Sequence, residues 1–401
     1  MKKINLLFAG ALVAGMATFS SCSSDGDNVD VPYIPGIPGD DLVTPNPNVP
    51  DPNTELPNFT YTIDKELGWA VIRLDMTGVL DPSTGESLRL FGPADRSKQN
   101  IWLSIDGKPK GFSIVNTAEL EDEVKKPVID LVFLVDNSTS MSQEADSIAE
   151  DIVKWAKSLE KNNDLRVGCV GYGGFISGAI NLTTADSLKI WLEKGQTGVM
   201  RTRDFEDRTQ EEADSLKAAA ALLDYRVVGT GYSYLYRSDP DESECGLLAL
   251  RFANDKFRFR PYSNRIYVNL TDEPNQPKGN ENFSTEWVSK EGNWPVTNGT
   301  IHTVYSADST FSVQKYYNER PWDLSDLTGG SKMFVNGYFR GVSLDSLKVT
   351  KVLQNSYIIK VTNVENVVDG QPHNVWITVK TADNKVFGDK HYNVLFRKQE
   401  E

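Results

Sequence analysis

Residues 129–141 read Ile-Asp-Leu-Val-Phe-Leu-Val-Asp-Asn-Ser-Thr-Ser-Met, an apolar run between two aspartates followed by a polar tail. The run at 131–135 is too short to span a membrane, and an unbroken run of this length is typical of a strand buried on both faces of a parallel sheet. Asp136, Ser138 and Ser140 follow at alternate positions. One carboxylate and two hydroxyls so spaced can converge on a hard cation that prefers oxygen ligands. The alternative is a Ser/Thr-rich turn that caps the next helix.

Strand-like and helix-like segments alternate after this run. Apolar residues at helical spacing predict an amphipathic helix over 143–161. We expect further strands at 165–171, 179–182, 265–269 and 301–305, and helices at 186–192, 211–223 and 324–327, the last stopped by glycines. This order predicts an α/β fold with a doubly wound, mostly parallel sheet. Ligands of such sheets bind at the carboxyl ends of the strands.

The segments on either side of the α/β pattern are rich in β signals. Residues 58–127 contain alternating apolar positions and an Asp106-Gly107 hairpin turn. Residues 338–401 contain one expected helix at 343–353, followed by strands. Together these antiparallel β segments have about the size of one β-sandwich, so our hypothesis is a sandwich built from 58–127 and 355–401, with the domain at 128–337 inserted into it. The alternative is two independent β modules.

The N-terminus has the features of a targeting segment. Lys2 and Lys3 precede an apolar stretch at 6–16, and small residues precede Cys22. The pattern resembles a bacterial lipoprotein signal over 1–21, with Cys22 as the lipid-bearing residue; the alternative is an ordinary secretory peptide. The run 23–27 resembles the acidic export signals of surface lipoproteins in Bacteroides-like bacteria. These features predict an exported outer-membrane lipoprotein on the cell surface of a Gram-negative bacterium.

The segment at 22–57 is predicted to be a tether. Eight of the nineteen prolines lie in 25–57, and such a composition favours an extended, semi-rigid spacer. No later stretch approaches the roughly 20 apolar residues that a spanning helix needs. The lipid is therefore the expected membrane attachment.

The net charge of the chain restricts the classes of partner. The formal charge is −14, and 39% of residues are hydrophobic, which indicates folded material. An acidic chain argues against nucleic acid and against anionic membrane surfaces as partners.

Four features in order carry a specific resemblance. The Asp-x-Ser-x-Ser pattern follows the first strand, Glu244 lies five positions before the Ala249-Leu250 pair, Asp272 follows the strand at 265–269, and Thr328-Gly329-Gly330 ends the last expected helix. The sequence over 128–337 resembles von Willebrand factor A domains with a metal-ion-dependent adhesion site. Most members have a Thr at the Glu244 position, and Glu is similar to the integrin β-subunit version. Thr230 is the competing candidate for that position.

The resemblance implies a cofactor and a mode of binding. Ser138, Ser140 and Glu244 would coordinate Mg²⁺ or Mn²⁺ directly, and Asp136 and Asp272 would act directly or through water. One coordination position would stay open for an acidic group of a partner. The integrin-like version also implies an auxiliary Ca²⁺ near Asp241, for which the alternative is an acid favoured at a helix N-terminus.

The same resemblance places Cys169 and Cys245 near the upper edge of the sheet. An exported protein can pair such cysteines, so a disulfide and two separate buried thiols both remain open.

The implied function is cell adhesion: a lipid-anchored adhesin or binding module that captures a protein or glycan through the cation. The alternative is a structural subunit of a fimbrial or surface assembly, whose metal site stabilises the fold or docks a neighbouring subunit. We expect no enzyme. His302, His373 and His391 share no zinc-ligand spacing, and the sequence contains no nucleophile elbow, phosphate loop or dinucleotide fingerprint.

Overall fold

The computed structural model describes residues 36–66, 69–119, 128–161, 163–195, 197–222, 244–261, 263–277, 281–290, 292–306, 319–335, 343–346 and 348–397. The predicted signal peptide with Cys22, and also Thr230 and Asp241, lie outside these ranges. Within them, no helix has the length and apolar character that crossing a membrane requires.

A seven-stranded sheet forms the centre of the α/β part, with the strand order β12-β11-β10-β6-β7-β8-β9. Its strands are β6 (Val128–Asp136), β7 (Asp164–Tyr172), β8 (Ile176–Thr183), β9 (Phe205–Glu206), β10 (Asn264–Thr271), β11 (Thr300–Tyr305) and β12 (Lys332–Phe334). All neighbours pair in parallel except β7 and β8. The prediction of a mixed α/β fold with a mostly parallel sheet is confirmed.

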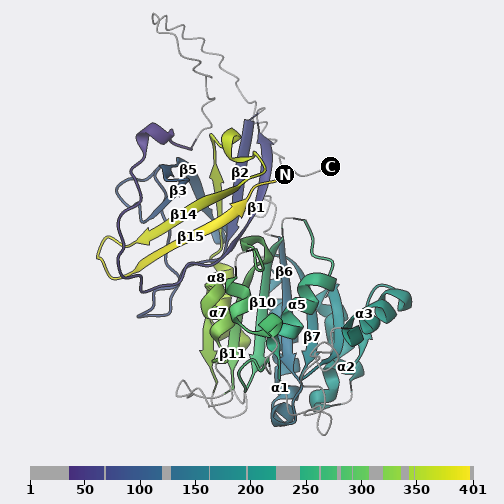
Figure 1. The fold of residues 1–401 in the computed structure, drawn as a ribbon. Helices are drawn as coiled ribbons and strands as arrows, with labels where there is room; N and C mark the ends of the chain where they lie inside the picture. Colours follow the sequence, from purple (N-terminus) through teal and green to yellow (C-terminus); the bar gives the residue numbers. More distant parts are fainter. Residues whose placement is uncertain are drawn as a thin grey trace, which may run out of the picture. The chain divides into compact units, whose positions relative to one another are not determined.

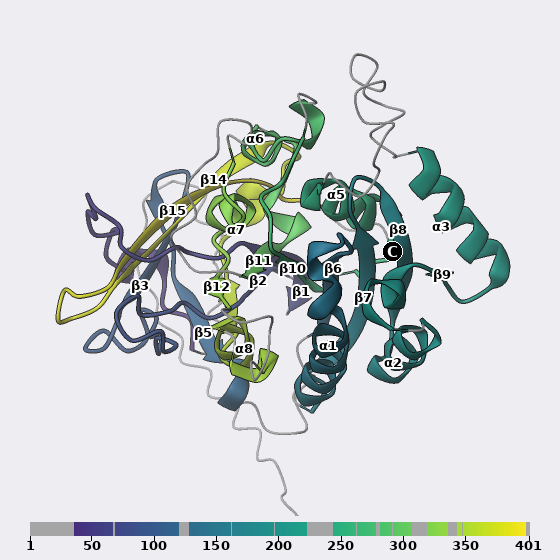
Figure 2. The same ribbon diagram turned by 90° about the horizontal axis from the view of Figure 1, so that it is seen from below.

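Helices cover both faces of this sheet (Figure 2). On one face lie α1 (Ala145–Leu159), α2 (Ala185–Lys194) and α8 (Lys348–Gln354), and on the other α3 (Gln210–Leu222), α5 (Gly246–Lys256), α6 (Glu286–Ser289) and α7 (Asp323–Thr328). Leu131 and Phe133 of β6 pack in the core with α1, whereas Val132 and Leu134 pack in the core with α5. Because both faces are covered, every position of the run at 131–135 is apolar.

The helix predicted at 343–353 is a short 3-10 turn, Leu344–Ser346, followed by α8. Trp155 Nε1 of α1 donates a hydrogen bond to Thr350 Oγ1 at 2.7 Å, and Leu353 is fully buried in the core beside α1. Helix α8 therefore completes the α/β part, although the predicted boundary at 337 separates it from that part.

Two four-stranded antiparallel sheets form the β part, with orders β1-β2-β13-β5 and β15-β14-β3-β4 (Figure 1). The strands are β1 (Phe59–Glu66), β2 (Trp69–Met76), β3 (Ile101–Ile105), β4 (Lys108–Pro109), β5 (Phe112–Asn116), β13 (Tyr357–Val361), β14 (Pro372–Lys380) and β15 (Phe387–Leu395). Strand β13 lies between β2 and β5, and β14 pairs with β3. Each sheet thus takes strands from both flanking segments, and one core joins them.

Residues 36–57 do not behave as a free spacer. Ile37, Val49 and Leu56 are buried. Asn46 Nδ2 donates to Trp376 O at 3.1 Å, and Lys110 Nζ donates to Asp40 Oδ2 at 2.9 Å. A few apolar side chains and several polar ones attach this proline-rich segment to the β part, which corrects the tether prediction for these residues.

The described residues also contain short 3-10 helices at Asp40–Leu42, Thr117–Glu119, Ser140–Gln143, Gly198–Thr202, Glu281–Phe283, Val296–Asn298, Leu344–Ser346 and Glu365–Val367. The predicted glycine stop of α7 is present, since Gly329 follows the helix in the left-handed conformation at φ 72°. A Cβ at Gly329 would meet Leu56 O at 2.1 Å, so only glycine fits there.

Candidate metal centre

Three predicted carboxylates meet at one edge of the seven-stranded sheet. Strand β6 ends at Asp136, the neighbouring strand β10 ends at Thr271 with Asp272 next in the chain, and both strands point to the same edge (Figure 1). Glu244 lies just before α5. Oxygen atoms of Asp136, Glu244 and Asp272 lie within 4.8 Å of one another. Residues far apart in the sequence are thereby brought into one cluster.

The two predicted serines belong to the same cluster. Ser138 Oγ lies 2.9 Å from Ser140 Oγ, and Ser140 Oγ donates to Asp272 Oδ1 at 3.1 Å. The backbone N–H of Ser138 donates to Asp136 Oδ1 at 2.8 Å, which fixes the turn after β6. All five residues of the predicted ligand set are therefore neighbours, and their binding of a metal stays a prediction.

Thr271 is a site residue that the sequence analysis did not single out. Its hydroxyl donates to Asp136 Oδ2 at 2.8 Å, so both oxygens of this buried carboxylate accept a hydrogen bond. In the sequence, its place at the end of an apolar strand, directly before Asp272, could have indicated this role. Thr271 orients Asp136 from the side of β10.

Asp136 and Glu244 are buried and Asp272 is partly buried, and none of the three forms an ion pair with a lysine or arginine among the described residues. Burial, reinforced by the neighbouring carboxylates, raises the pKa of Asp136 and Glu244, and burial raises the pKa of Asp272. Glu244 Oε2 is buried and has no hydrogen-bond partner in the part of the chain that the structure describes. Buried charges need partners or metal ions. The donor set of carboxylates and hydroxyls fits a hard divalent cation, which would supply the missing positive charge.

The cluster opens into a hollow of about 610 Å³. Its lining residues are Thr139, Ser140, Ser142, Gln143, Glu144, Asp272 and Ser306. Glu144 Oε2 accepts a hydrogen bond from Ser306 Oγ at 2.5 Å, and burial raises its pKa. Because Ser140 and Asp272 belong to both the cluster and the hollow, a ligand can reach the site from solvent.

Cys169 and Cys245 are two separate, buried thiols, so the disulfide alternative is not found. Cys169 lies on β7 and packs in the core beside α1, whereas Cys245 lies before α5 in the core of the opposite face. The sheet stands between the two side chains.

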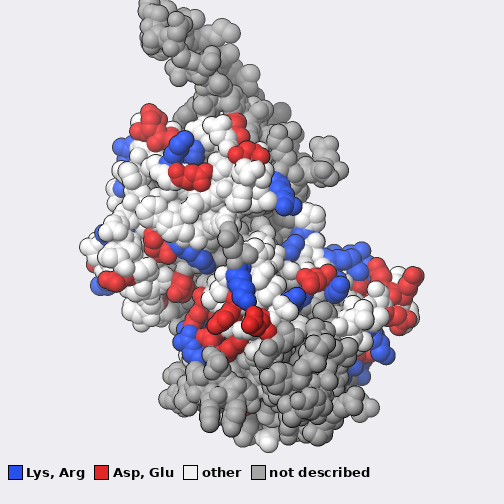
Figure 3. All heavy atoms as spheres, viewed as in Figure 1, with Lys and Arg blue, Asp and Glu red and all other residues white. Residues whose placement is uncertain are grey.

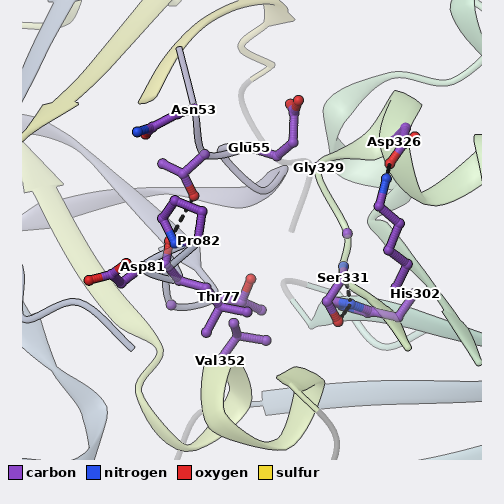
Figure 4. A pocket seen from close by; sticks show the side chains of 15 residues that line it. Asn53, Glu55, Thr77, Asp81, Pro82, His302, Asp326, Gly329, Ser331 and Val352 are labelled. Atoms are coloured by element: carbon purple, nitrogen blue, oxygen red, sulfur yellow. Dashed lines mark hydrogen bonds and ion pairs between the residues drawn. The ribbon is translucent and has the colours of Figure 1, made fainter. Parts of the chain in front are cut away.

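A second cavity, of about 410 Å³, lies elsewhere (Figure 4). Segment 53–55, segment 77–82 and the end of α7 line it, together with His302 and Val352. Lys332 Nζ donates to Asp326 Oδ1 at 2.7 Å, which pairs its only lysine. Within the described ranges, the side chains that could together hold a metal ion are those of Asp136, Glu244 and Asp272. None of them lines this cavity, so it is not the candidate centre.

Charges are mixed on the face drawn in Figure 3, where acidic and basic side chains are interspersed. No broad basic area covers the described residues on that face.

The comparisons with known proteins give structural likenesses and no family. No family model matches the chain, and no curated protein matches it. An aerotolerance-related membrane protein of Bacteroides fragilis is similar at 13% identity and a TM-score of 0.28, over 52% of this chain and 92% of that chain. The protein BatB of Bacteroides thetaiotaomicron has 11% identity and a TM-score of 0.30, over 56% and 96%. The PilB minor pilin of Streptococcus sanguinis has 12% identity and a TM-score of 0.28, over 74% and 75%. Likenesses at these scores identify no activity.

Proposed function

We propose that this chain is a non-catalytic binding module that captures an acidic group of a protein or glycan partner through Mg²⁺ or Mn²⁺. The observation that supports the proposal most strongly is the convergence of Asp136, Glu244 and Asp272 within 4.8 Å beside two serine hydroxyls. These residues would hold the cation in the manner of a von Willebrand factor A domain.

The cation would supply a Lewis-acidic position for the partner. Mg²⁺ prefers octahedral oxygen coordination and keeps part of its water shell, and the hollow beside Ser140 and Asp272 gives access to that shell. Glu244 in place of a threonine adds a negative charge. This residue strengthens cation binding and weakens the attraction of the bound cation for an anionic partner. We therefore expect tight cation binding and modest partner affinity.

The site of action in this proposal is the outside of the cell. Lys2, Lys3 and Cys22 fit a lipoprotein signal, and a lipid at Cys22 would anchor the folded part to the outer membrane. The proposed role is that of an adhesin.

The test is binding of the purified chain, with Cys22→Ser to remove the lipid site, to a panel of matrix proteins and glycans in Mg²⁺, Mn²⁺ or EDTA. We expect at least one partner whose binding needs the cation and is lost with Asp136→Ala. Circular dichroism must show that Asp136→Ala still folds. Binding that persists in EDTA, or in the Asp136→Ala variant, contradicts the proposal.

A second experiment, co-purification from the native membrane with Cys22 unchanged, addresses the structural alternative. A subunit of a surface assembly would bind no panel member and would co-purify with its neighbours from the native membrane. Loss of that co-purification in EDTA would assign the metal site to docking between subunits.

A further inference from the structure

The buried side chain of Asn275 has a complete set of hydrogen bonds beside the candidate centre. Its Oδ1 accepts from the backbone N–H of Leu247 at 3.0 Å and from Cys245 Sγ at 3.3 Å. Its Nδ2 donates to Phe283 O and to Glu319 Oε2, both at 2.8 Å. An asparagine side chain offers two acceptor sites and two donors, and all four are used here.

These bonds act on the segment that carries Glu244. The backbone of residues 244–247 is held at three points: Gln276 N–H donates to Glu244 O at 2.8 Å, Cys245 N–H donates to Gly173 O at 3.1 Å, and Leu247 N–H donates to Asn275. Two of the three points come from residues 275 and 276, three and four positions after Asp272. The chain that supplies one predicted ligand therefore also holds the backbone of another.

The carboxylate of Glu244 is buried and only partly bonded. Ser138 hydrogen-bonds to it, whereas its Oε2 has no partner among the described residues. The place of this carboxylate in the cluster therefore depends on where the backbone at 244–247 is held.

We propose that Asn275 is the positioning residue that sets the place of Glu244 and so determines the affinity of the site for its cation. The inference rests on the proposed metal site. Asparagine is required because the position must accept from the start of α5 and donate to Glu319. An aspartate would place a second carboxylate against Glu319, and a leucine would leave the Leu247 N–H without an acceptor.

The test is Mn²⁺ affinity, measured by calorimetric titration of the whole chain with Cys22→Ser, alongside the melting temperature in EDTA. Asn275→Ala should weaken Mn²⁺ binding by about tenfold or more, the usual cost of losing a residue that orients a ligand. In a Glu244→Gln background the same change should have little further effect, because the ligand that Asn275 positions is already altered. If Asn275→Ala weakens Mn²⁺ binding by the same factor in the parent and in the Glu244→Gln variant, the proposal is wrong.

The matched control is Asn58→Ala. Asn58 and Asn275 are both 7% exposed, and Asn58 also donates to a backbone carbonyl, Gly299 O at 3.1 Å. Asn58→Ala should lower the melting temperature and leave Mn²⁺ affinity unchanged. If Asn275→Ala behaves in the same way, its role is structural only and the proposal fails. Absence of Mn²⁺ binding by the parent chain would instead refute the metal site itself.

If Asn275→Ala does not fold, substitutions that exchange the carboxylate and the amide between positions 275 and 319 test the same role. Asn275→Asp keeps the shape of the side chain but opposes Glu319, and should weaken Mn²⁺ binding. Adding Glu319→Gln restores a carboxylate–amide hydrogen bond with the roles reversed and should recover most of the affinity. If Asn275→Asp binds Mn²⁺ with the same affinity with and without Glu319→Gln, Asn275 does not position Glu244.

Discussion

Ser140 Oγ donates a hydrogen bond to Asp272 Oδ1 at 3.1 Å, which joins the turn after β6 to the end of β10 across 132 positions of the chain. The contact follows from the parallel pairing of β6 and β10, because parallel neighbours end at the same edge of a sheet. The hydroxyl of Thr271 makes a second link between these strands, to Asp136. A ligand set assembled in this way depends on sheet register, so cation binding and folding should be coupled.

The first prediction is that Mn²⁺ or Mg²⁺ stabilises the folded chain. A ligand that binds only the folded state adds about 2.7 kcal/mol at a hundredfold excess over its dissociation constant. Thermal melts in EDTA, Mg²⁺, Mn²⁺ and Ca²⁺ measure the effect. Asp272→Ala should abolish the rise in melting temperature that the cation causes. The control Asp51→Asn should retain it, because Asp51 is an exposed acid in the segment that packs against the β part. No shift with any cation would contradict the metal assignment.

Glu244→Gln should raise the stability of the metal-free chain and reduce the stability that a bound cation adds. In EDTA the variant should be more stable than the parent, because burial and the charges of Asp136 and Asp272 oppose the ionised carboxylate that the substitution removes. In Mn²⁺ it should gain less stability than the parent, because a charged ligand is lost. Thermal melts in EDTA and in Mn²⁺ measure both effects, and Glu365→Gln, at an exposed position, is the control. A variant that is less stable in both buffers would show that the carboxylate does not repel its neighbours.

The sequence predicted the elements of the site well because its signals are local. The apolar run at 131–135 is buried on both faces, and the strand therefore ends where Asp136, Ser138 and Ser140 begin. The resemblance to von Willebrand factor A domains then selected Glu244, from its spacing to the Ala249-Leu250 pair, and Asp272, from its place after the strand at 265–269.

The parts that were not predicted depend on contacts between distant segments. Residues 36–57 have the composition of a spacer, yet Leu56 is buried and Asn46 hydrogen-bonds to β14. The role of Asn275 appears only when α5 and Glu319 surround it. The two cysteines looked pairable in sequence, and the sheet that separates them is a property of the fold.

His373 should stabilise the β part more at acidic than at basic pH. Its Nδ1 lies 2.7 Å from Asp106 Oδ2 and its Nε2 lies 2.9 Å from Asp369 Oδ1. Burial alone would lower the pKa of His373, but the hydrogen bonds to both aspartates outweigh burial and raise it. A folded-state pKa above the unfolded value gives a contribution that is complete below the unfolded pKa and is lost as pH rises through the folded pKa.

Urea unfolding of His373→Gln therefore should show a deficit relative to the parent at about pH 6 that narrows by about pH 8.5. Asp106→Asn should reduce the same pH dependence, since it removes one of the two acceptors. A deficit of equal size at both pH values would show that the imidazolium contributes no pH-dependent stability.

His302 should have the opposite pH dependence. It lies on β11 beside the second cavity (Figure 4), where its Nδ1 accepts the Ser331 N–H at 2.9 Å, so the proton of the neutral ring is on Nε2. That Nε2 is buried without a partner in the described part of the chain. Burial lowers the pKa of His302 to about 3. The folded state thus resists protonation, and its stability is complete above the unfolded pKa and decreases as pH falls below that value.

Between about pH 7.5 and about pH 5 this group alone should cost the parent about 2 kcal/mol. His302→Gln keeps an acceptor for Ser331 and cannot take up a proton, so its free energy of unfolding should improve by that amount relative to the parent over the same interval. Urea unfolding at several pH values measures the difference, and His373→Gln, whose predicted dependence has the opposite sign, is the control. If parent and His302→Gln lose stability in parallel on acidification, the imidazole is not kept neutral in the folded chain.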